Sequence, residues 1–277
     1  MSITIRQLGD ADVEAVDPLL RAAYRVTFSR SLELHRNLAI QPDGWLIAER
    51  DGVPVGIVGV TNYRRFAYVG LMAVDPQVHR QGIGRMLMEA LLRRDYPTLW
   101  LDATPAGAPL YRSYGFVQDG QSALYEQIKP VQCVAHAQVR RMIPADLPTL
   151  TALDAPIFGA DRSRVLIRLL GELPERAFVA QDKLGKLAGF IFAQSATLGP
   201  WVATTPTLAA ALIDTALALA PIEHARVLIA QSHPHADAIL AERGFVLQRT
   251  LEHMRRGPAQ HWGQPELRYG LTSFALG

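Results

Sequence analysis

Apolar residues recur at helical spacing in two segments of the first 130 residues. Between Asp10 and Tyr24 they lie three and four positions apart, and a second such stripe runs from residue 83 to residue 94. We therefore predict a helix over each segment, with Asp10 as the N-cap of the first. A further short helix is predicted to end at Gly115, because glycine is favoured in the left-handed conformation that follows a helix.

Continuous apolar runs predict the strands of a sheet. These runs are residues 45–50, 55–60, 67–74, 98–103, 116–117 and 124–128. The first two are separated by a turn that contains Asp51 and Gly52, a pair that tolerates positive φ, so they predict a β-hairpin. The last two are expected to close the sheet. Because hairpins alternate with strand–helix–strand crossovers, we predict a mixed sheet.

The second half of the chain repeats the plan of the first. Pro76 and Pro206 occupy matching places 130 residues apart, and other landmarks match at offsets that fall slowly from 134 to 129. Loss of a few loop residues produces such a drift, whereas chance matches would scatter. We predict two domains, 1–130 and 136–277.

Composition limits the classes of function. The chain has 28 Lys and Arg against 26 Asp and Glu, a net charge of +2, which predicts no nucleic-acid-binding surface. Its one cysteine, Cys133, excludes an internal disulfide framework and a multi-cysteine zinc site. The first residues lack the pattern of a secretory signal, and no apolar run is long enough to span a membrane. We expect a soluble cytoplasmic protein.

The most specific signal lies between the third strand and the long helix. Gly82 and Gly84 lack a Cβ, so the backbone there can approach a ligand closely. They stand at a helix N-terminus, where unpaired amides and the helix dipole favour an anion. Arg80 and Arg85 flank them and can add charge-assisted hydrogen bonds. Together these residues predict a pyrophosphate site.

Two other ligand hypotheses are weaker. A nicotinamide dinucleotide would suit Asp102 at a strand end, but its fingerprint needs a small residue where this chain has Leu87. A dinucleotide domain also opens with its first strand and glycine loop, whereas here a helix and a hairpin come first. A metal site at His233 and His235 has no further ligand at suitable spacing before Asp237, and the start of a helix explains the pair.

Two motifs in the first half resemble the GNAT superfamily of N-acetyltransferases. The stretch GLMAVDPQVHRQGIGRML is similar to the family's pyrophosphate loop, Q/R-x-x-G-x-G/A, and LDATPAGAPLYRSYGF is similar to its later segment, roughly N-x-x-A-x-x-L-Y-x-x-x-G-F. His79, Thr104 and Gly107 depart from the usual residues. The resemblance covers residues 3–130. It implies an α/β (α+β) fold class with two tandem GNAT-like domains, each a mixed, mostly antiparallel twisted sheet flanked by helices.

The same resemblance implies acetyl-CoA as the co-substrate and names the residues that would bind it. The strand before the loop would diverge from the next strand, and its backbone would pair with pantetheine as if with another strand. The loop would hold the pyrophosphate. The implied cofactor-binding residues are Met72, Ala73, Val74, His79, Arg80, Gln81, Gly82, Ile83, Gly84, Arg85 and Thr104.

The resemblance also assigns a general acid, Tyr111, which would protonate the departing thiolate. An amide near Met72 would stabilise the oxyanion that forms when an amine attacks. The sequence does not identify the general base that would deprotonate the acceptor amine. An amine of pKa about 10 is neutral in roughly one molecule per thousand at pH 7, a cost of about 4 kcal/mol. Tyr68 stands where some members have a glutamate base, so Asp102, Glu126, a solvent-relayed base and an amine of lowered pKa are the alternatives.

The second half lacks these features. At the matching strand–helix junction stand Thr204, Thr205 and Thr207, with no glycine pair and no flanking arginine, and one of these threonines can cap the helix. Leu240 takes the place of Tyr111. We expect no acetyl transfer in this half.

As a whole, the chain resembles two-domain GNAT proteins with a degenerate second copy. That resemblance rests on residues 158–162, 168–170 and 276–277. Such a domain would shape the acceptor pocket, because ligand sites favour domain interfaces. Asp161 and Arg162 are candidates there, but the sequence favours a helix cap and a surface charge for them.

The sequence therefore predicts an N-acetyltransferase that moves an acetyl group from acetyl-CoA to a primary amine by direct attack. The acceptor is expected to be a small-molecule or peptide amine, without a metal, nucleic acid or membrane partner, and a homodimer is compatible with the sequence. The alternative is a non-catalytic CoA-binding regulatory protein, which the missing glutamate and the degenerate second half favour.

Overall fold

The computed structural model describes residues 2–230, 233–260 and 262–277. Its strands are β1 (Ile3–Gln7), β2 (Trp45–Arg50), β3 (Val53–Asn62), β4 (Ala67–Val74), β5 (Leu99–Ala103), β6 (Val117–Gln127), β7 (Val139–Arg141), β8 (Ala177–Gln181), β9 (Leu187–Ala193), β10 (Leu198–Ala203), β11 (Arg226–Ala230), β12 (Phe245–Arg256) and β13 (Arg268–Gly270). Its α-helices are α1 (Val13–Tyr24), α2 (Ser31–Ile40), α3 (Ile83–Leu91), α4 (Ala108–Arg112), α5 (Leu147–Phe158), α6 (Ser163–Glu172), α7 (Pro206–Leu219) and α8 (Ala236–Ala241). Short 3₁₀ turns are η1 (Asp10–Asp12), η2 (Pro76–Val78), η3 (Pro144–Asp146), η4 (Pro174–Arg176) and η5 (Pro265–Leu267).

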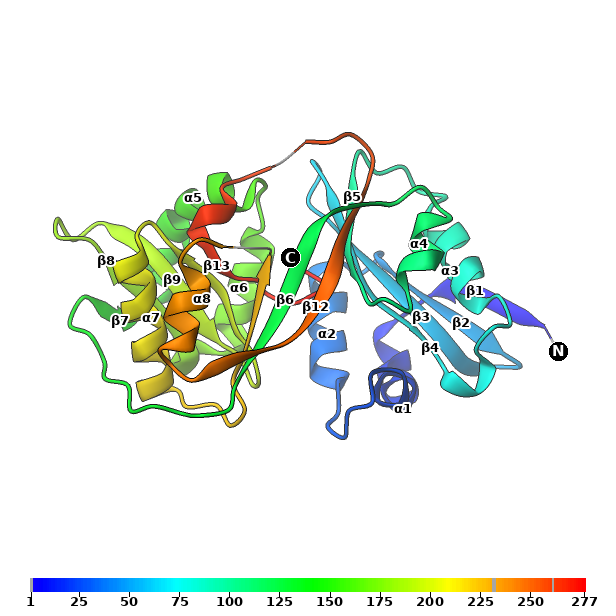
Figure 1. The fold of residues 1–277 in the computed structure, drawn as a ribbon. Helices are drawn as coiled ribbons and strands as arrows, with labels where there is room; N and C mark the ends of the chain where they lie inside the picture. The colour runs from blue at the N-terminus through cyan, green and yellow to red at the C-terminus, as the bar shows by residue number, and fades with distance from the viewer. Residues whose placement is uncertain (1, 231–232, 261) are drawn as a thin grey trace.

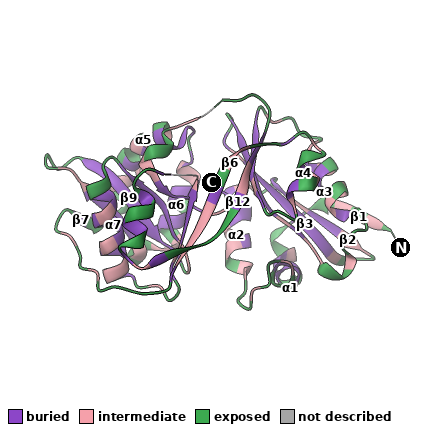
Figure 2. Cartoon of the chain, in the orientation of Figure 1, coloured by how far each residue is buried: buried purple, intermediate pink, exposed green. Residues whose placement is uncertain are grey.

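The described strands form two sheets, and the larger one contains strands from both halves of the chain (Figure 1). The larger has the order β1-β2-β3-β4-β5-β12-β6-β11, and the smaller has the order β13-β10-β9-β8-β7. In the first half α3 and α4 pack on one face of the sheet and α1 and α2 on the other. In the second half α7 and α8 cover one face and α5 and α6 the other. Buried residues follow the strands in both halves (Figure 2).

The predicted hairpin and mixed sheet are confirmed in the first half. β4 has the predicted bounds, and β2 pairs with β3 across a turn in which Asp51 and Gly52 have φ of 50° and 81°. β4 and β5 run parallel, whereas the other pairs of this sheet are antiparallel. From β2 to α4, the observed order of strands and α-helices is therefore the one that the apolar pattern predicts.

The helices differ from the prediction in two details. Asp10 is not the cap of the first helix, because the Gly9 amide donates to Asp12 Oδ2 at 2.8 Å and the Asp10 carboxylate lies 2.6 Å from His35 Nδ1. The sequence also does not predict α2. Its buried positions include the polar Asn37, which interrupts the apolar stripe that would indicate a helix.

The two halves exchange strands. Residues 116–117 and 124–128 do not form two closing strands; one continuous strand, β6, covers this region. Its neighbour is β12 from the second half, which lies between β5 and β6, while β6 also pairs with β11. Figure 1 shows β6 and β12 side by side in the middle of the molecule. Each half's fifth strand thus pairs with the other half's sixth strand, and the boundaries 1–130 and 136–277 stay a prediction.

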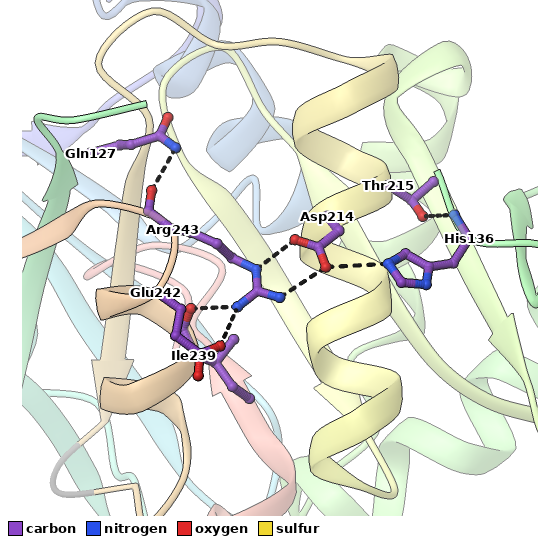
Figure 3. A network of polar contacts seen from close by, with 7 residues as sticks. All are labelled: Gln127, His136, Asp214, Thr215, Ile239, Glu242 and Arg243. Atoms are coloured by element: carbon purple, nitrogen blue, oxygen red, sulfur yellow. Dashed lines mark hydrogen bonds and ion pairs between the residues drawn. The ribbon is translucent and has the colours of Figure 1, made fainter. Parts of the chain in front are cut away.

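A polar network ties the start of the second half and the end of β6 to the helices of the second half (Figure 3). The Arg243 guanidinium donates to both carboxylate oxygens of Asp214 at 2.6 and 2.8 Å, and His136 Nε2 lies 3.2 Å from the same carboxylate. Gln127, the last residue of β6, donates to the Arg243 carbonyl at 2.9 Å. Burial would raise the pKa of Asp214, but the hydrogen bonds from Arg243 and His136 outweigh it and hold that pKa below its usual value.

The interface between the halves is also apolar. Phe66 and Trp100 of the first half stack with ring centroids 4.5 Å apart, and Phe66 lies 5.5 Å from Phe158 of α5. All three belong to one buried cluster. Burying each such ring contributes about 1.5–3 kcal/mol, so the two halves stabilise each other. Among the described helices, none has the length and apolar character needed to cross a bilayer.

Candidate functional site

The strands β4 and β5 separate after two residue pairs. Their parallel ladder consists of Ala67 with Leu99 and Tyr68 with Trp100. Beyond that point Leu71 has φ of 49°, and the register of β4 against β3 shifts there, which marks a β-bulge. Residues 69–74 therefore have no partner strand on the side of β5 within the described chain.

The end of this unpaired edge leads into the N-terminus of α3. The first helical hydrogen bond runs from the Met86 amide to the Gly82 carbonyl, at 3.0 Å. The amides of Ile83, Gly84 and Arg85 precede it and have no acceptor among the described residues. Gly82 has φ of 80°, and a Cβ added to it would meet nothing within 4 Å. The loop thus presents free donors next to open space, as an anion site requires.

Side chains of the loop hold its backbone in place. His79 Nε2 donates to the Val74 carbonyl at 3.0 Å, and Gln81 Oε1 accepts a hydrogen bond from the Arg50 guanidinium. Both predicted anion-binding arginines, Arg80 and Arg85, are exposed, and neither forms an ion pair with a described residue. Their charges are therefore available to a ligand, whereas the His79 ring stabilises the loop.

Thr104 is occupied by the turn that follows β5. Its Oγ1 accepts from the Gly107 amide at 3.2 Å, and its carbonyl accepts from the amides of Gly107 and Ala108, both at 2.9 Å. The side chain therefore organises the start of α4. Its predicted contact with pantetheine stays a prediction.

Tyr111 and Tyr24 approach the unpaired edge from different helices. Tyr111 is 7% exposed and packs edge-on against Phe116, with ring centroids 5.9 Å apart. Burial raises the pKa of Tyr111 well above its usual value, and the nearby Tyr24 raises it further. The Tyr111 hydroxyl has no hydrogen-bond partner among the described residues. Tyr24, which the sequence did not single out, donates to the Met72 carbonyl at 3.3 Å, and partial burial raises its pKa to about 12.

A cavity of about 320 Å³ lies at the point where β4 and β5 separate, on the face of the sheet opposite α3. Tyr68 and Trp100, the last paired residues, line it together with residues of the second half, including His253, Arg268 and Gly277. Ligand sites favour such places between domains.

A compact polar cluster lies behind the part of the cavity wall that Tyr68 and His253 form. The Asp102 carboxylate is fully buried and accepts hydrogen bonds from Tyr68 OH at 3.0 Å and from Ser122 Oγ at 2.6 Å. His253 Nδ1 lies 2.9 Å from the same carboxylate. Burial, together with the charge of Asp102, raises the pKa of Tyr68 far above its usual value, so Tyr68 is a hydrogen-bond donor. The sequence predicts Asp102 as a candidate base but not His253.

Two family models, each described as an acetyltransferase (GNAT) domain, match the chain over residues 41–118 and 150–270. The chain belongs to the GNAT superfamily. It is a tandem member, and the predicted fold class, two GNAT-like domains with a mixed sheet and helices, is confirmed. Acetyl-CoA is the co-substrate that this family implies. The unpaired edge of β4 and the free amides of α3 fit such a ligand.

Several proteins are similar to this GNAT chain. An uncharacterized N-acetyltransferase, YitH of Bacillus subtilis, is 28% identical over 234 residues, which cover 80% of this chain and 81% of that protein. The crystal structure of a protein from Pyrococcus horikoshii, described there as an acetyltransferase by assignment only, is 26% identical with a TM-score of 0.88, covering 99% and 96% of the two chains. A tandem GNAT protein from the clavulanic acid biosynthesis pathway shares the fold at 17% identity, with a TM-score of 0.64 and coverage of 94% and 100%.

In the second GNAT domain the corresponding gap is filled by the protein itself. Within the described residues, a parallel bridge joins Thr197, which directly precedes β10, to Arg226, the first residue of β11, and β10 and β11 do not pair beyond it. β13 then lies between them: it pairs with β10 at Trp201 and Val202, and the Leu271 amide donates to the Leu228 carbonyl at 2.7 Å. β13 covers only the three residues Arg268–Gly270.

The predicted threonine cap of the second domain is confirmed. Thr205 Oγ1 accepts from the Leu208 amide at 3.3 Å at the start of α7. Leu240, the counterpart of Tyr111, is fully buried in the apolar core. His233 Nδ1 accepts from the amides of His235 and Ala236, so it organises the start of α8, as the helix-start interpretation predicts.

Three further candidates are not among the residues that line the cavity between the two domains. Glu126 pairs with Arg226, with the two charged groups 3.3 Å apart at the far edge of the sheet, so it is not placed to act as a base. Asp161 accepts from the Ser163 amide at 2.7 Å and caps α6. Arg162 is 2% exposed, so its interpretation as a surface charge is wrong; it forms a two-pronged ion pair with Asp154, with both contacts at 2.8 Å.

Proposed function

We propose that the protein is an acetyl-CoA-dependent N-acetyltransferase whose reaction takes place in the first domain. The observation that carries this proposal is the continuity between the unpaired edge at residues 69–74 and the free amides at residues 83–85. An extended pantetheine arm suits the edge, and a pyrophosphate suits the amides and the flanking guanidiniums. Bound acetyl-CoA supplies an acetyl group activated as a thioester.

Tyr111 is the proposed general acid. Its raised pKa keeps the hydroxyl protonated throughout the neutral range, and that hydroxyl has no partner among the described residues that would compete for its proton. A phenol in this state can donate to a sulfur that gains negative charge as the C–S bond breaks. His79 and Gln81 support the loop, while Arg80 and Arg85 hold the diphosphate.

The experiment measures release of free thiol from acetyl-CoA with a panel of primary amines. We expect turnover by the unmodified protein. We expect Tyr111→Phe to lower kcat by about 10²-fold, because it removes the proton donor while keeping the ring. Its affinity for acetyl-CoA, measured by calorimetry, should stay unchanged. Tyr114→Phe is the matched control, because the Tyr114 hydroxyl already bonds Glu89 and the Arg85 carbonyl and so is not free to act on a thiolate. Full activity in Tyr111→Phe would refute the assignment.

The second candidate is a non-catalytic CoA-binding regulator, favoured by the uncharged Tyr68 at the position of the family's glutamate. Binding of acetyl-CoA without turnover of any amine would support it. A nicotinamide-dependent function would instead predict that NAD, and not coenzyme A, raises the melting temperature. We expect the opposite.

A further inference from the structure

We propose that His253, on the exchanged strand β12, is the general base that takes a proton from the acceptor amine, and that the cavity between the two domains binds this amine. The proposal rests on the proposed N-acetyl transfer and extends it to the acceptor side. It assigns to the second domain a group that acts in the first.

The geometry of the His253–Asp102 pair favours His253 as the general base. His253 Nδ1 lies 2.9 Å from the Asp102 carboxylate, so Nδ1 carries the proton and donates it to that oxygen. Nε2 is then left with a free lone pair, and it has no partner among the described residues. The His253 side chain is 18% exposed and lines the cavity. Asp102 is a positioning residue: its buried charge fixes the ring and stabilises the imidazolium that forms when Nε2 accepts a proton.

The cavity lies where an acceptor has to arrive. Tyr68 and Trp100 mark the inner end of the unpaired edge, and both line the cavity. Asp102 follows two residues later on β5, on the same face as Trp100. An amine in the cavity therefore reaches the inner end of the edge from the face opposite α3, so that it does not compete with the loop and its ligand for space.

Other groups around the cavity are less suited to act as the base. Tyr68 has a pKa far above neutrality, and Asp102 already accepts three hydrogen bonds. Asp119 lies 3.3 Å from the Arg255 guanidinium. His233 Nδ1 caps α8. The titratable and charged groups that line the cavity with His253 are Tyr68 on β4, Asp119 on β6, His233 before α8, Glu266 on η5 and Arg268 on β13. Asp102 on β5 does not line the cavity and contacts His253 from the buried side.

In the proposed step, protons move between the substrates, the side chains of His253 and Tyr111, and solvent. The acceptor ammonium gives one proton to His253 Nε2, and the neutral amine forms a C–N bond to the acetyl carbon while the C–S bond breaks. Tyr111 gives its proton to the sulfur, and the nitrogen releases its second proton to solvent as the amide forms. Tyr111 regains a proton from solvent and His253 returns its proton there. An ammonium and a thioester thus become an amide, a thiol and one proton.

The test compares His253→Gln with the unmodified protein on two amines. One is an alkylamine of pKa about 10, and the other is an alkoxyamine, which is already neutral at pH 7. We expect kcat for the alkylamine to fall by about 10²-fold at pH 7, because the base is lost. The alkoxyamine should keep its rate, since it has no proton to lose before it attacks. His224→Gln, a change at an exposed histidine that faces Glu126, is the control and should leave both rates unchanged.

A second variant separates chemistry from folding. Asp102→Asn keeps the hydrogen-bonding shape but removes the charge that stabilises the imidazolium, so kcat should fall for the alkylamine and stay unchanged for the alkoxyamine. Calorimetry with acetyl-CoA checks that each variant is folded. Equal losses on both amines, or no loss on either, would overturn the assignment of His253 while leaving the transferase function intact. An unmodified protein that binds acetyl-CoA but acetylates no amine would refute the proposed function itself.

Discussion

Gly82 and Gly185 have the same backbone conformation in different settings. Their φ values are 80° and 77°, and a Cβ added to either would meet nothing within 4 Å. Gly82 precedes the free amides of α3, whereas Gly185 lies in the exposed turn between β8 and β9. A side chain in this conformation costs about 1–2 kcal/mol. An alanine would therefore introduce the same backbone strain at either position, but only Gly82 lies beside the proposed ligand site.

We predict that Gly82→Ala weakens the binding of acetyl-CoA by about tenfold, because the free loop relaxes its strain by turning the amides away and binding has to reverse that change. Gly185→Ala should lower the melting temperature as much as Gly82→Ala does, but it should leave the affinity for acetyl-CoA unchanged. Titration calorimetry of both variants makes the comparison. Equal affinities in the two would argue against an anion site at this loop.

At the scale of residues, the sequence predicts those site residues that lie close together along the chain. The loop glycines, its arginines and Tyr111 lie within two short motifs, so their spacing alone predicts them. His253 lies 151 residues from Asp102, and only the exchange of strands brings the two together. Arginine is mostly found on protein surfaces, and only the fold shows that Arg162 is buried beside Asp154.

At the scale of elements, the exchange of β6 and β12 makes each domain part of the other's sheet. Met254 on β12 is fully buried in the core of the first domain, among the residues that pack under α3. β12 pairs along its length with β6 and at five positions with β5. Without it, β5 and most of β6 would expose unpaired edges, which favour aggregation.

We therefore predict that residues 1–135 produced alone do not form a stable monomer. Co-expression with residues 136–277 should restore a soluble complex with one cooperative unfolding transition. Size-exclusion chromatography and thermal unfolding measure both outcomes. A monomeric first half that melts at the temperature of the whole chain would show that β12 is dispensable.

The apolar pattern predicts strands and helices well, because burial on one face leaves a periodicity in the sequence. It does not predict which strand is the neighbour of which. β6 has the same alternation whether its partner follows it directly or comes from β12, more than 100 residues later. The continuous β6 and the exchange were missed for this reason, whereas β4 and the hairpin of β2 and β3 were predicted correctly.

At the scale of the whole molecule, the two domains share one fold but differ at the gap between their middle strands and at the N-terminus of the helix that follows. The first leaves an edge of β4 unpaired and places a glycine loop at its end. The second fills the equivalent place with β13 and caps α7 with Thr205. A peptide strand satisfies the backbone of β10 there, so that place is closed to pantetheine. The sequence predicts the missing loop in the second copy but not the strand that fills it.

Titration of the full chain with acetyl-CoA tests this account most directly, because it counts the places where the cofactor is held. We predict one equivalent bound per chain, with heat released only while that one place is being filled. Two equivalents per chain, or none, would contradict the account.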